Sequence, residues 1–329
     1  MATKPQRALR KDFLVFGSPL IEDAEIQEVV ATLRSGWVGT GPKVQRFETA
    51  FRGYLGTEHA LAVNSCTAAL HLSLLALNLP PDSEVITTPM TFCATVNAVI
   101  HAGAKPVLAD CDRRTMNIDP AQIERRITPK TRAIVPVHFA GRPCDMDAVM
   151  DIAKRHKLAV VEDCAHSIES LYKGRKTGTF GDMGCFSFYV TKNLTTAEGG
   201  MVATNDKDHA DAIKILGLHG MSKDAWKRFS DDGYKHYEVV AAGFKYNMTD
   251  IQAAMGLHQL PRIDRLWDRR LSVWKRYDAA FAGLPCELPA PPEKDTKHAL
   301  HLYTLLVDPV RSGKTRDQVP ARTTLRSDT

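Results

Sequence analysis

The chain has 329 residues, 44% of them hydrophobic, and a formal net charge of +5. This length and composition predict a large buried core, organised as one large domain and a smaller one. The positive charge suits an anionic ligand but lacks the Lys/Arg stripe that is typical of nucleic-acid binding. The sequence has no apolar run of about 18 residues and no export signal, so we expect a cytoplasmic protein without a membrane span.

Short β-rich segments alternate with helical periods through much of the chain. Strands are expected at 59–64, 84–88, 105–110, 132–139 and 158–163, with helices at 67–77, 92–103, 120–127 and 146–156 between them. This alternation is typical of βαβ units around a largely parallel sheet, which binds its ligands where the strands end. Two further strands are expected at 184–190 and 199–205, and two helices at 206–218 and 249–260.

The region after Pro261 has a different pattern. A charged helix is expected at 263–283, a Pro-rich connector at 285–294 and a strand at 298–307. We therefore expect a flexible N-terminus (1–12), a large cofactor-binding domain (13–260), a partial small domain (261–310) and a loose tail (311–329). The small domain is expected to be shortened.

Lys192 is the most informative residue of the sequence. It lies between the two expected strands at 184–190 and 199–205, among apolar residues and just before a Glu-Gly-Gly turn. An amine becomes a good imine-forming nucleophile where burial or nearby positive charge lowers its pKa. Asp163 ends an earlier apolar strand, and the pair suggests an enzyme that uses pyridoxal phosphate (PLP). Lysines more often solvate a surface, so the neighbouring motifs carry much of this hypothesis.

A polar turn at residues 64–69 joins a strand to a helix. The N–H groups at a helix N-terminus favour a phosphate, and Thr67 and the N–H of Ala68 are the predicted donors. Ser187 is a possible second phosphate donor. The alternative is that Ser65 or Thr67 acts only as the helix N-cap, and the two roles are compatible.

Acidic residues end the strand at 158–163. A carboxylate against the pyridine nitrogen keeps that nitrogen protonated, so that the ring accepts an electron pair, and Asp163 is the predicted residue. Glu162 points to the opposite face of an alternating strand and is expected to be structural. His166 is a candidate for the ring hydroxyl, and Phe92 for stacking on the ring, although a core role is as common for either.

Two other cofactor classes are disfavoured. An NAD-dependent dehydrogenase needs a Gly-x-Gly-x-x-Gly turn after a strand, and GTGPKV has only its beginning. The SGKT segment at 312–315 lacks the first glycine of a P-loop. No metal site is expected, and the scattered cysteines are expected to be reduced thiols.

The motifs together identify a family. Between residues 13 and 307 the chain resembles the DegT/DnrJ/EryC1/StrS sugar aminotransferases, and most of all their UDP-4-amino-4-deoxy-L-arabinose branch. The motifs are SGWVGTGPKV, NSCTAALHLSLLAL, GAKPVLAD, PVHFAGRPCDMD, VVEDCAHS, GCFSFYVTKNLTTAEGGMV, HGMSKDAW and GFKYNMTDIQAA. The resemblance implies the aspartate-aminotransferase-like fold of PLP-dependent transferases (fold type I), with a mostly parallel sheet flanked by helices.

The resemblance also implies residue roles. Lys192 would hold the cofactor covalently and Asp163 would contact its ring nitrogen, while Asn247 would reach the cofactor phosphate of the neighbouring subunit. Active sites would then be shared across a homodimer, with residues 37–43 near the interface. The remaining implied cofactor contacts are the phosphate-binding Thr67, Ala68 and Ser187, with Phe92 on the ring and His166 near its oxygen.

The implied reaction moves an amino group from L-glutamate to a nucleotide-linked keto sugar. A lysine at position 192 favours amino transfer, because relatives with histidine there act as dehydratases. Two alternatives remain: amination of another cyclic ketone such as an inosose, and a noncatalytic regulatory or binding protein of the same fold.

Overall fold

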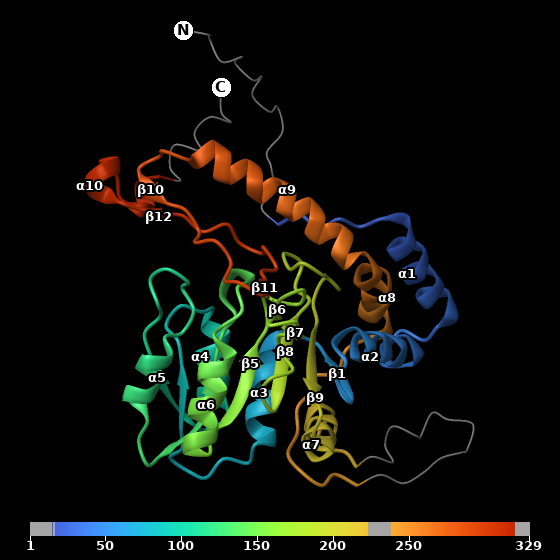
Figure 1. Cartoon of the computed structure of the whole chain (residues 1–329). Helices are drawn as coiled ribbons and strands as arrows, with labels where there is room; N and C mark the ends of the chain where they lie inside the picture. Colours follow the sequence, from blue (N-terminus) through green and yellow to red (C-terminus); the bar gives the residue numbers. More distant parts are fainter. Residues whose placement is uncertain (1–14, 16, 223–237, 320–329) are drawn as a thin grey trace.

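The computed structural model describes residue 15 and the ranges 17–222 and 238–319. Its centre is a seven-stranded sheet of order β1-β9-β8-β5-β4-β2-β3 (Figure 1). β9 pairs antiparallel with both neighbours, and the strands from β8 to β3 run parallel. The predicted mostly parallel sheet is therefore confirmed. Its strands are β1 (His59–Val63), β2 (Glu84–Thr87), β3 (Lys105–Leu108), β4 (Thr131–Val135), β5 (Ala159–Asp163), β8 (Met183–Ser187) and β9 (Gly200–Thr204).

Helices cover both faces of this sheet. Successive strand residues point to opposite faces, so Val161 packs in one apolar core and Val160 in another. The first core includes residues of α3 (Cys66–Ala76), α4 (Cys93–His101) and α7 (Lys207–Gly217). On the opposite face lie α5 (Pro120–Arg126) and α6 (Met146–His156), and also α2 (Pro42–Leu55) and α8 (Asp250–Gln259).

A long helix leaves the sheet at its edge. α8 runs through the 3-10 turn η3 (Leu260–Arg262) into α9 (Ile263–Phe281), and α1 (Asp23–Ser35) packs along α8. Arg262 forms ion pairs with Glu22 and Glu25, which fasten the start of α1 to this junction. Figure 1 shows α9 crossing above the sheet towards the C-terminal elements.

The C-terminal segment differs from the predicted strand at 298–307. β12 (Leu306–Val307) pairs with β10 (Cys286–Glu287), but the residues before it do not extend a sheet. Ala299 donates its N–H to Gly141 O and His301 donates to Ala140 O, and Leu300 has a φ of 56°. The predicted strand is wrong there because the left-handed residue turns the backbone towards η1 (Phe139–Gly141).

Short elements complete the described chain. β11 (Thr296–Lys297) joins the hairpin of β6 (Leu171–Tyr172) and β7 (Arg175–Lys176), which ties the C-terminal segment to the large domain. α10 (Pro309–Ser312) and η4 (Arg316–Gln318) lie where a loose tail was expected. The expected flexible residues 1–12 and the last ten residues lie outside the described ranges.

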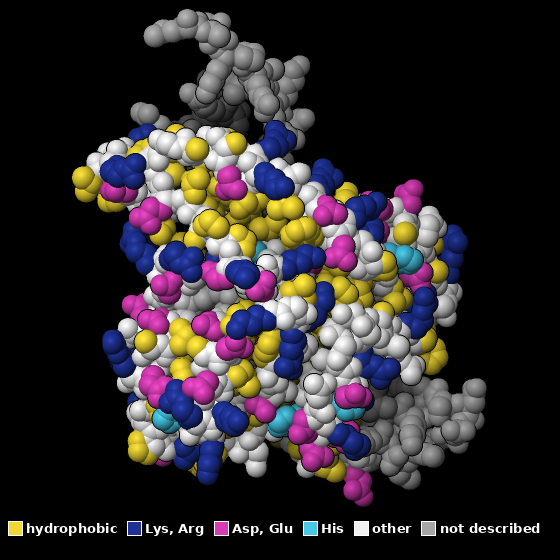
Figure 2. Space-filling view, viewed as in Figure 1, with side chains coloured by type: hydrophobic (Ala, Val, Ile, Leu, Met, Phe, Trp, Pro, Cys, Tyr) yellow, Lys and Arg dark blue, Asp and Glu magenta, His cyan; other side chains and the backbone are white. Residues whose placement is uncertain are grey.

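The surface of the C-terminal region carries many apolar groups. Figure 2 shows hydrophobic side chains gathered below α9. Tyr277 of this helix stacks on Phe281 and lies edge-on to Tyr303, with Tyr277 42% exposed. In the described part of the chain, every helix is too short or too polar to span a bilayer.

Candidate active site

Lys192 lies in the loop between β8 and β9, as predicted. Its backbone N–H donates to Tyr189 O at 2.9 Å, which closes a turn directly after β8. The side chain is half-buried, and this burial lowers the pKa of the amine against the opposing effects of Cys66 and Asp163. Within the described residues the ammonium makes no hydrogen bond or ion pair. The amine is therefore left available to a ligand.

Asp163 ends β5 with its side chain buried. Oδ2 accepts a hydrogen bond from Thr95 Oγ1 at 2.8 Å, and Oδ1 accepts from Ala165 N at 3.1 Å. Burial raises the pKa of this carboxyl, and the two hydrogen bonds and the charge of Lys192 oppose the shift. A cation held against Asp163 would offset the cost of burying its charge. The mutual pKa effects of Asp163 and Lys192 show that the two groups share one neighbourhood.

His166 lies within the electrostatic reach of Lys192. Its Nδ1 accepts the N–H of Ala140 at 3.3 Å, so the neutral ring carries its proton on Nε2. Burial, followed by the charge of Lys192, lowers the pKa of His166 to about 3. The ring lies 4.4 Å from that of His301, centroid to centroid, with 31° between their planes. His166 is therefore a neutral hydrogen-bond donor over a wide pH range.

The N-terminus of α3 approaches the strand that follows the lysine loop. A Cβ atom built on Gly200 would lie 2.5 Å from the carbonyl carbon of Ser65, so only glycine fits there. Ser187 pairs with Gly200 in the sheet, which brings the Ser187 side chain to the same region. Ser65 Oγ accepts the N–H of Ala68 at 3.1 Å, and Thr67 is exposed. The N-cap interpretation of Ser65 is thus correct, and phosphate contacts by Thr67 and Ala68 stay predictions.

Phe92 lies at the N-cap of α4, the helix that supplies Thr95 to Asp163. Its ring is 73% exposed, so it is not a core residue of this chain. Stacking on a cofactor ring remains a prediction, and the exposed ring is available for it.

Asn247 forms an isolated β-bridge with Val63, the last residue of β1. Its Nδ2 donates to Thr40 Oγ1 and its Oδ1 accepts from Lys245 Nζ, both at 2.6 Å. Thr40 belongs to the predicted interface segment 37–43. Residues 223–226 of the HGMSKDAW motif lie outside the described ranges.

Sequence reasoning missed three residues of this site: Thr95, Cys66 and His301. Thr95 bonds Asp163, the thiol of Cys66 lies near Lys192 and Asp163, and the ring of His301 packs against that of His166 in a tilted arrangement. The first two lie on helices whose N-termini were expected near the site, a signal that would have found them. His301 was assigned to a strand, and a strand at that position gave no reason to expect its contact with His166.

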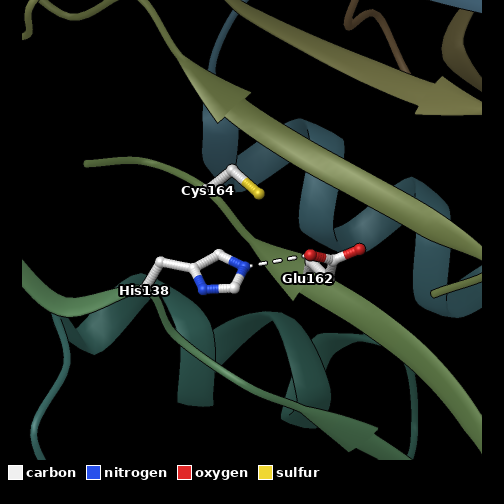
Figure 3. Close-up of side chains that lie close together, drawn as sticks. All are labelled: His138, Glu162 and Cys164. Atoms are coloured by element: carbon white, nitrogen blue, oxygen red, sulfur yellow. Dashed lines mark hydrogen bonds and ion pairs between the residues drawn. The ribbon is translucent and has the colours of Figure 1, made fainter. Parts of the chain in front are cut away.

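Glu162 lies on the opposite side of β5, as predicted, in a cluster with His138 and Cys164 (Figure 3). The ligand atoms of the three side chains lie within 4.8 Å of one another, a spacing that would suit a metal ion. Glu162 is fully buried and accepts backbone N–H groups from Gly178, Phe180 and Gly181 at 2.7–2.8 Å. Its carboxylate is thus already satisfied by donors.

His138 and Cys164 are also both protonated at the atom that would bind a metal ion. His138 Nδ1 accepts the N–H of Cys144 at 3.0 Å, so Nε2 carries a proton and donates it to Glu162 at 3.0 Å. Burial raises the pKa of Cys164 well above its ordinary value, which keeps the thiol protonated. A metal ligand would have to be deprotonated in both cases, so this cluster fits a structural role.

The fold is that of the PLP-dependent aminotransferases, as comparisons with known proteins show. The chain is 52% identical over 310 residues to the spore coat polysaccharide biosynthesis protein SpsC of Bacillus subtilis, covering 94% of this chain and 80% of SpsC. The PLP-form of the putative sugar aminotransferase Spr1654 from Streptococcus pneumoniae superposes with a TM-score of 0.87 at 34% identity, covering 95% of this chain and 83% of that one. DesI, solved in the presence of its TDP-sugar product, gives a TM-score of 0.83 at 33% identity, covering 96% and 77%.

A model of the DegT/DnrJ/EryC1/StrS aminotransferase family matches residues 19–326. The chain therefore belongs to this family, and its cofactor is pyridoxal phosphate. The described residues fit that cofactor, because the amine of Lys192 makes no hydrogen bond or ion pair among them and burial raises the pKa of the Asp163 carboxyl, which a protonated ring nitrogen would offset. The N-terminus of α3 adds N–H groups suited to a phosphate.

Replacing Glu162 with glutamine should destabilise the protein by roughly 2–4 kcal/mol, because the amide turns an NH₂ group towards buried donors. Urea denaturation of the wild type and of Glu162→Gln measures this change. Glu58→Gln, on the surface, is the matched control and should change the free energy of unfolding by less than about 0.5 kcal/mol. Equal stability of the two variants would contradict the structural role of Glu162.

Proposed function

We propose that this protein transfers an amino group from L-glutamate to the keto group, at carbon 4, of a nucleotide-linked sugar. The observation that carries the proposal is the pairing of a half-buried lysine that lacks a hydrogen-bonding partner with a buried carboxylate. The two half-reactions follow one another at the same site, so glutamate is converted and its product leaves before the sugar binds. PLP, when bound, supplies the electron sink for the pair of electrons left at the substrate carbon.

Lys192 acts first as the covalent anchor and then as the acid and base. Its lowered pKa favours the neutral amine, which accepts a proton at Nζ from the substrate carbon after the donor amine has displaced it. The same Nζ would deliver the proton to the carbon that was the aldehyde carbon of the cofactor. Because the amine makes no hydrogen bond or ion pair within the described residues, its movement between these positions breaks no such contact there.

Asp163 holds a proton on the ring nitrogen. Its two hydrogen bonds, from Thr95 and Ala165, orient the carboxylate and favour its ionised form. His166, with its proton on Nε2, would donate to the ring oxygen, and the exposed side chain of Phe92 would cover a face of the ring. Together these residues would hold the cofactor ring in a fixed orientation relative to Lys192.

Thr67, Ala68 and Ser187 bind the phosphate in this proposal. They gather where the positive end of the α3 dipole meets the end of β8, and a phosphate is favoured at such a place. The N–H of Ala68 is shared with the Ser65 cap, so its contribution to the phosphate is expected to be smaller than that of the Thr67 hydroxyl.

The sugar substrate is inferred from relatives. DesI was solved with a TDP-sugar product, and SpsC is a protein of polysaccharide biosynthesis. We propose a sugar nucleotide for this chain as well, used in polysaccharide assembly. The specific proposal is the UDP-4-amino-4-deoxy-L-arabinose branch, on the sequence motifs described above. Residues 13–260 would form the cofactor domain, and residues 261–310 the part of the small domain that borders it.

A homodimer with shared sites completes the proposal. Asn247 would contact the phosphate bound by the neighbouring subunit, and residues 37–43 would lie near the interface. Thr40 holds the Asn247 side chain, which links the two predicted interface features within one chain. Trp37 and Val38 are each more than 40% exposed, as expected of residues that a partner covers.

The purified protein should show a visible chromophore that borohydride traps on the chain, and Lys192→Ala should lose it. The covalent link requires the ε-amine, whereas noncovalent binding of the cofactor does not. Absorbance spectra before and after borohydride, with mass spectrometry of the peptide that contains residue 192, measure the link. Lys176→Ala, which removes another half-buried lysine of lowered pKa, is the control and should keep the chromophore. A wild type without a lysine-linked chromophore would end the proposal.

Glutamate should convert the bound chromophore to its aminated form, and a nucleotide-linked 4-keto sugar should restore it. Spectra after each addition, and mass spectrometry of the sugar, report both halves of the reaction. A matched 3-keto sugar nucleotide and an inosose serve as competing acceptors. Faster turnover of either one would replace the proposed substrate without affecting the assignment of Lys192.

Mixing two inactive variants should test the shared site. If Asn247 serves the neighbouring subunit, a mixed dimer of Lys192→Ala and Asn247→Asp contains one intact site. Random mixing then restores about a quarter of wild-type activity, because about half the dimers are mixed and each has one working site of two. Asn247→Asp keeps an acceptor for Lys245 and repels the phosphate. If Asn247 serves its own subunit, no activity returns on mixing.

A further inference from the structure

The residue after the lysine is held by a segment from the C-terminal region. Asn193 Nδ2 donates to Glu169 Oε2 at 2.9 Å and to Ala299 O at 3.1 Å, and its Oδ1 accepts from His301 Nδ1 at 2.9 Å. Both hydrogens of the amide and its oxygen are thus engaged. A displacement of Asn193 would break these bonds, so they restrain the backbone on the C-terminal side of Lys192.

A buried charge pair supports Asn193. Glu169 is fully buried, and its other oxygen accepts from Arg270 of α9. Arg270 Nε also donates to Ala299 O at 3.3 Å. The carbonyl of Ala299 therefore joins Arg270 and Asn193, and α9 contributes a permanent positive charge to the support of the lysine loop.

His301 connects this network to His166. Since Asn193 Oδ1 is an acceptor, His301 carries its proton on Nδ1, and its ring packs on that of His166 at 4.4 Å. The groups that influence His301 electrostatically are His166, Lys192, Arg270 and His298. Burial and these groups keep the His301 ring neutral, so its contacts with Asn193 and His166 persist across the pH range of an assay.

We propose that His301 is a positioning residue for the amino transfer. Its Nδ1–H fixes Asn193 and hence the loop of Lys192, and its ring holds the imidazole of His166 in the orientation that turns Nε2–H towards the cofactor. This inference rests on the proposed function, since it assigns His301 to the support of Lys192 and His166. His301 itself need not touch the substrate or the cofactor.

Three substitutions separate the contact of His301 with Asn193 from its contact with His166. His301→Phe keeps a ring against His166 but loses the donor to Asn193, whereas His301→Asn keeps a donor but loses the ring. His301→Ala loses both. Tyr303→Phe is the matched control, because it removes one hydrogen bond from the same segment, that of Tyr303 Oη to Asp278 at 2.7 Å.

The holoenzyme of each variant is titrated with pH while its visible spectrum is recorded, and kcat and KM for glutamate are measured. Weaker donation to the ring oxygen leaves the chromophore's proton more tightly held, so its titration midpoint moves to higher pH. We expect a shift of roughly 0.5–1 pH unit in His301→Ala and His301→Asn, and less in His301→Phe. We expect kcat to fall about tenfold in His301→Ala and His301→Phe, with KM within about twofold.

Tyr303→Phe should change neither the titration midpoint nor kcat. The dissociation constant for PLP, measured by fluorescence on the apoprotein, should rise in His301→Ala alone. An unchanged midpoint and kcat in all three His301 variants would overturn the inference, as would equal effects in Tyr303→Phe. If His301→Ala does not fold, the Phe and Asn variants decide the question through their opposite patterns. A wild type without a lysine-linked chromophore would instead refute the proposed function.

Discussion

The buried carboxylate of Glu162 is the interaction on which the candidate site depends. It accepts a hydrogen bond from His138, which follows β4, and three from N–H groups of residues 178–181, which precede β8, so it joins β5 to segments next to both of its neighbouring strands. Because strand residues alternate in direction, the same strand turns the next carboxylate, Asp163, to the other face. The carboxylate proposed to bind the cofactor is thus positioned by bonds made outside the site.

The lysine loop is supported from two sides. Asn193 ties it to Glu169 and to the segment at 299–301, while Gly17 packs on the neighbouring Thr191. A Cβ on Gly17, whose φ is 66°, would lie 2.6 Å from Thr191 Cγ2, so the contact requires a glycine. Lys192 itself keeps its amine free of hydrogen bonds within the described residues, and the rigidity of the loop comes from its neighbours.

Much of this arrangement was predictable from the sequence, because it follows from patterns among residues close together in the chain. The alternation of β-rich and helical segments predicted the parallel sheet, and two apolar strands around Lys192 placed that residue between β8 and β9. The contacts of Asn193 with Ala299 and His301 join residues far apart in the chain, which no local pattern reveals. The segment at 298–307 was assigned to a strand because its apolar residues suit one, yet the left-handed backbone of Leu300 overrides that preference.

The bracing of the lysine loop has a consequence for how the protein folds. The partners of residues 191 and 193 include positions 17 and 299–301, so these contacts join parts of the chain that are more than 100 residues apart. Long loops close late because their closure costs the most chain entropy. The parallel strands from β8 to β3 pair over much shorter separations, so this part of the sheet is expected to form before the reactive centre does. Binding of the cofactor would then come after the distant segments of the chain have been brought together.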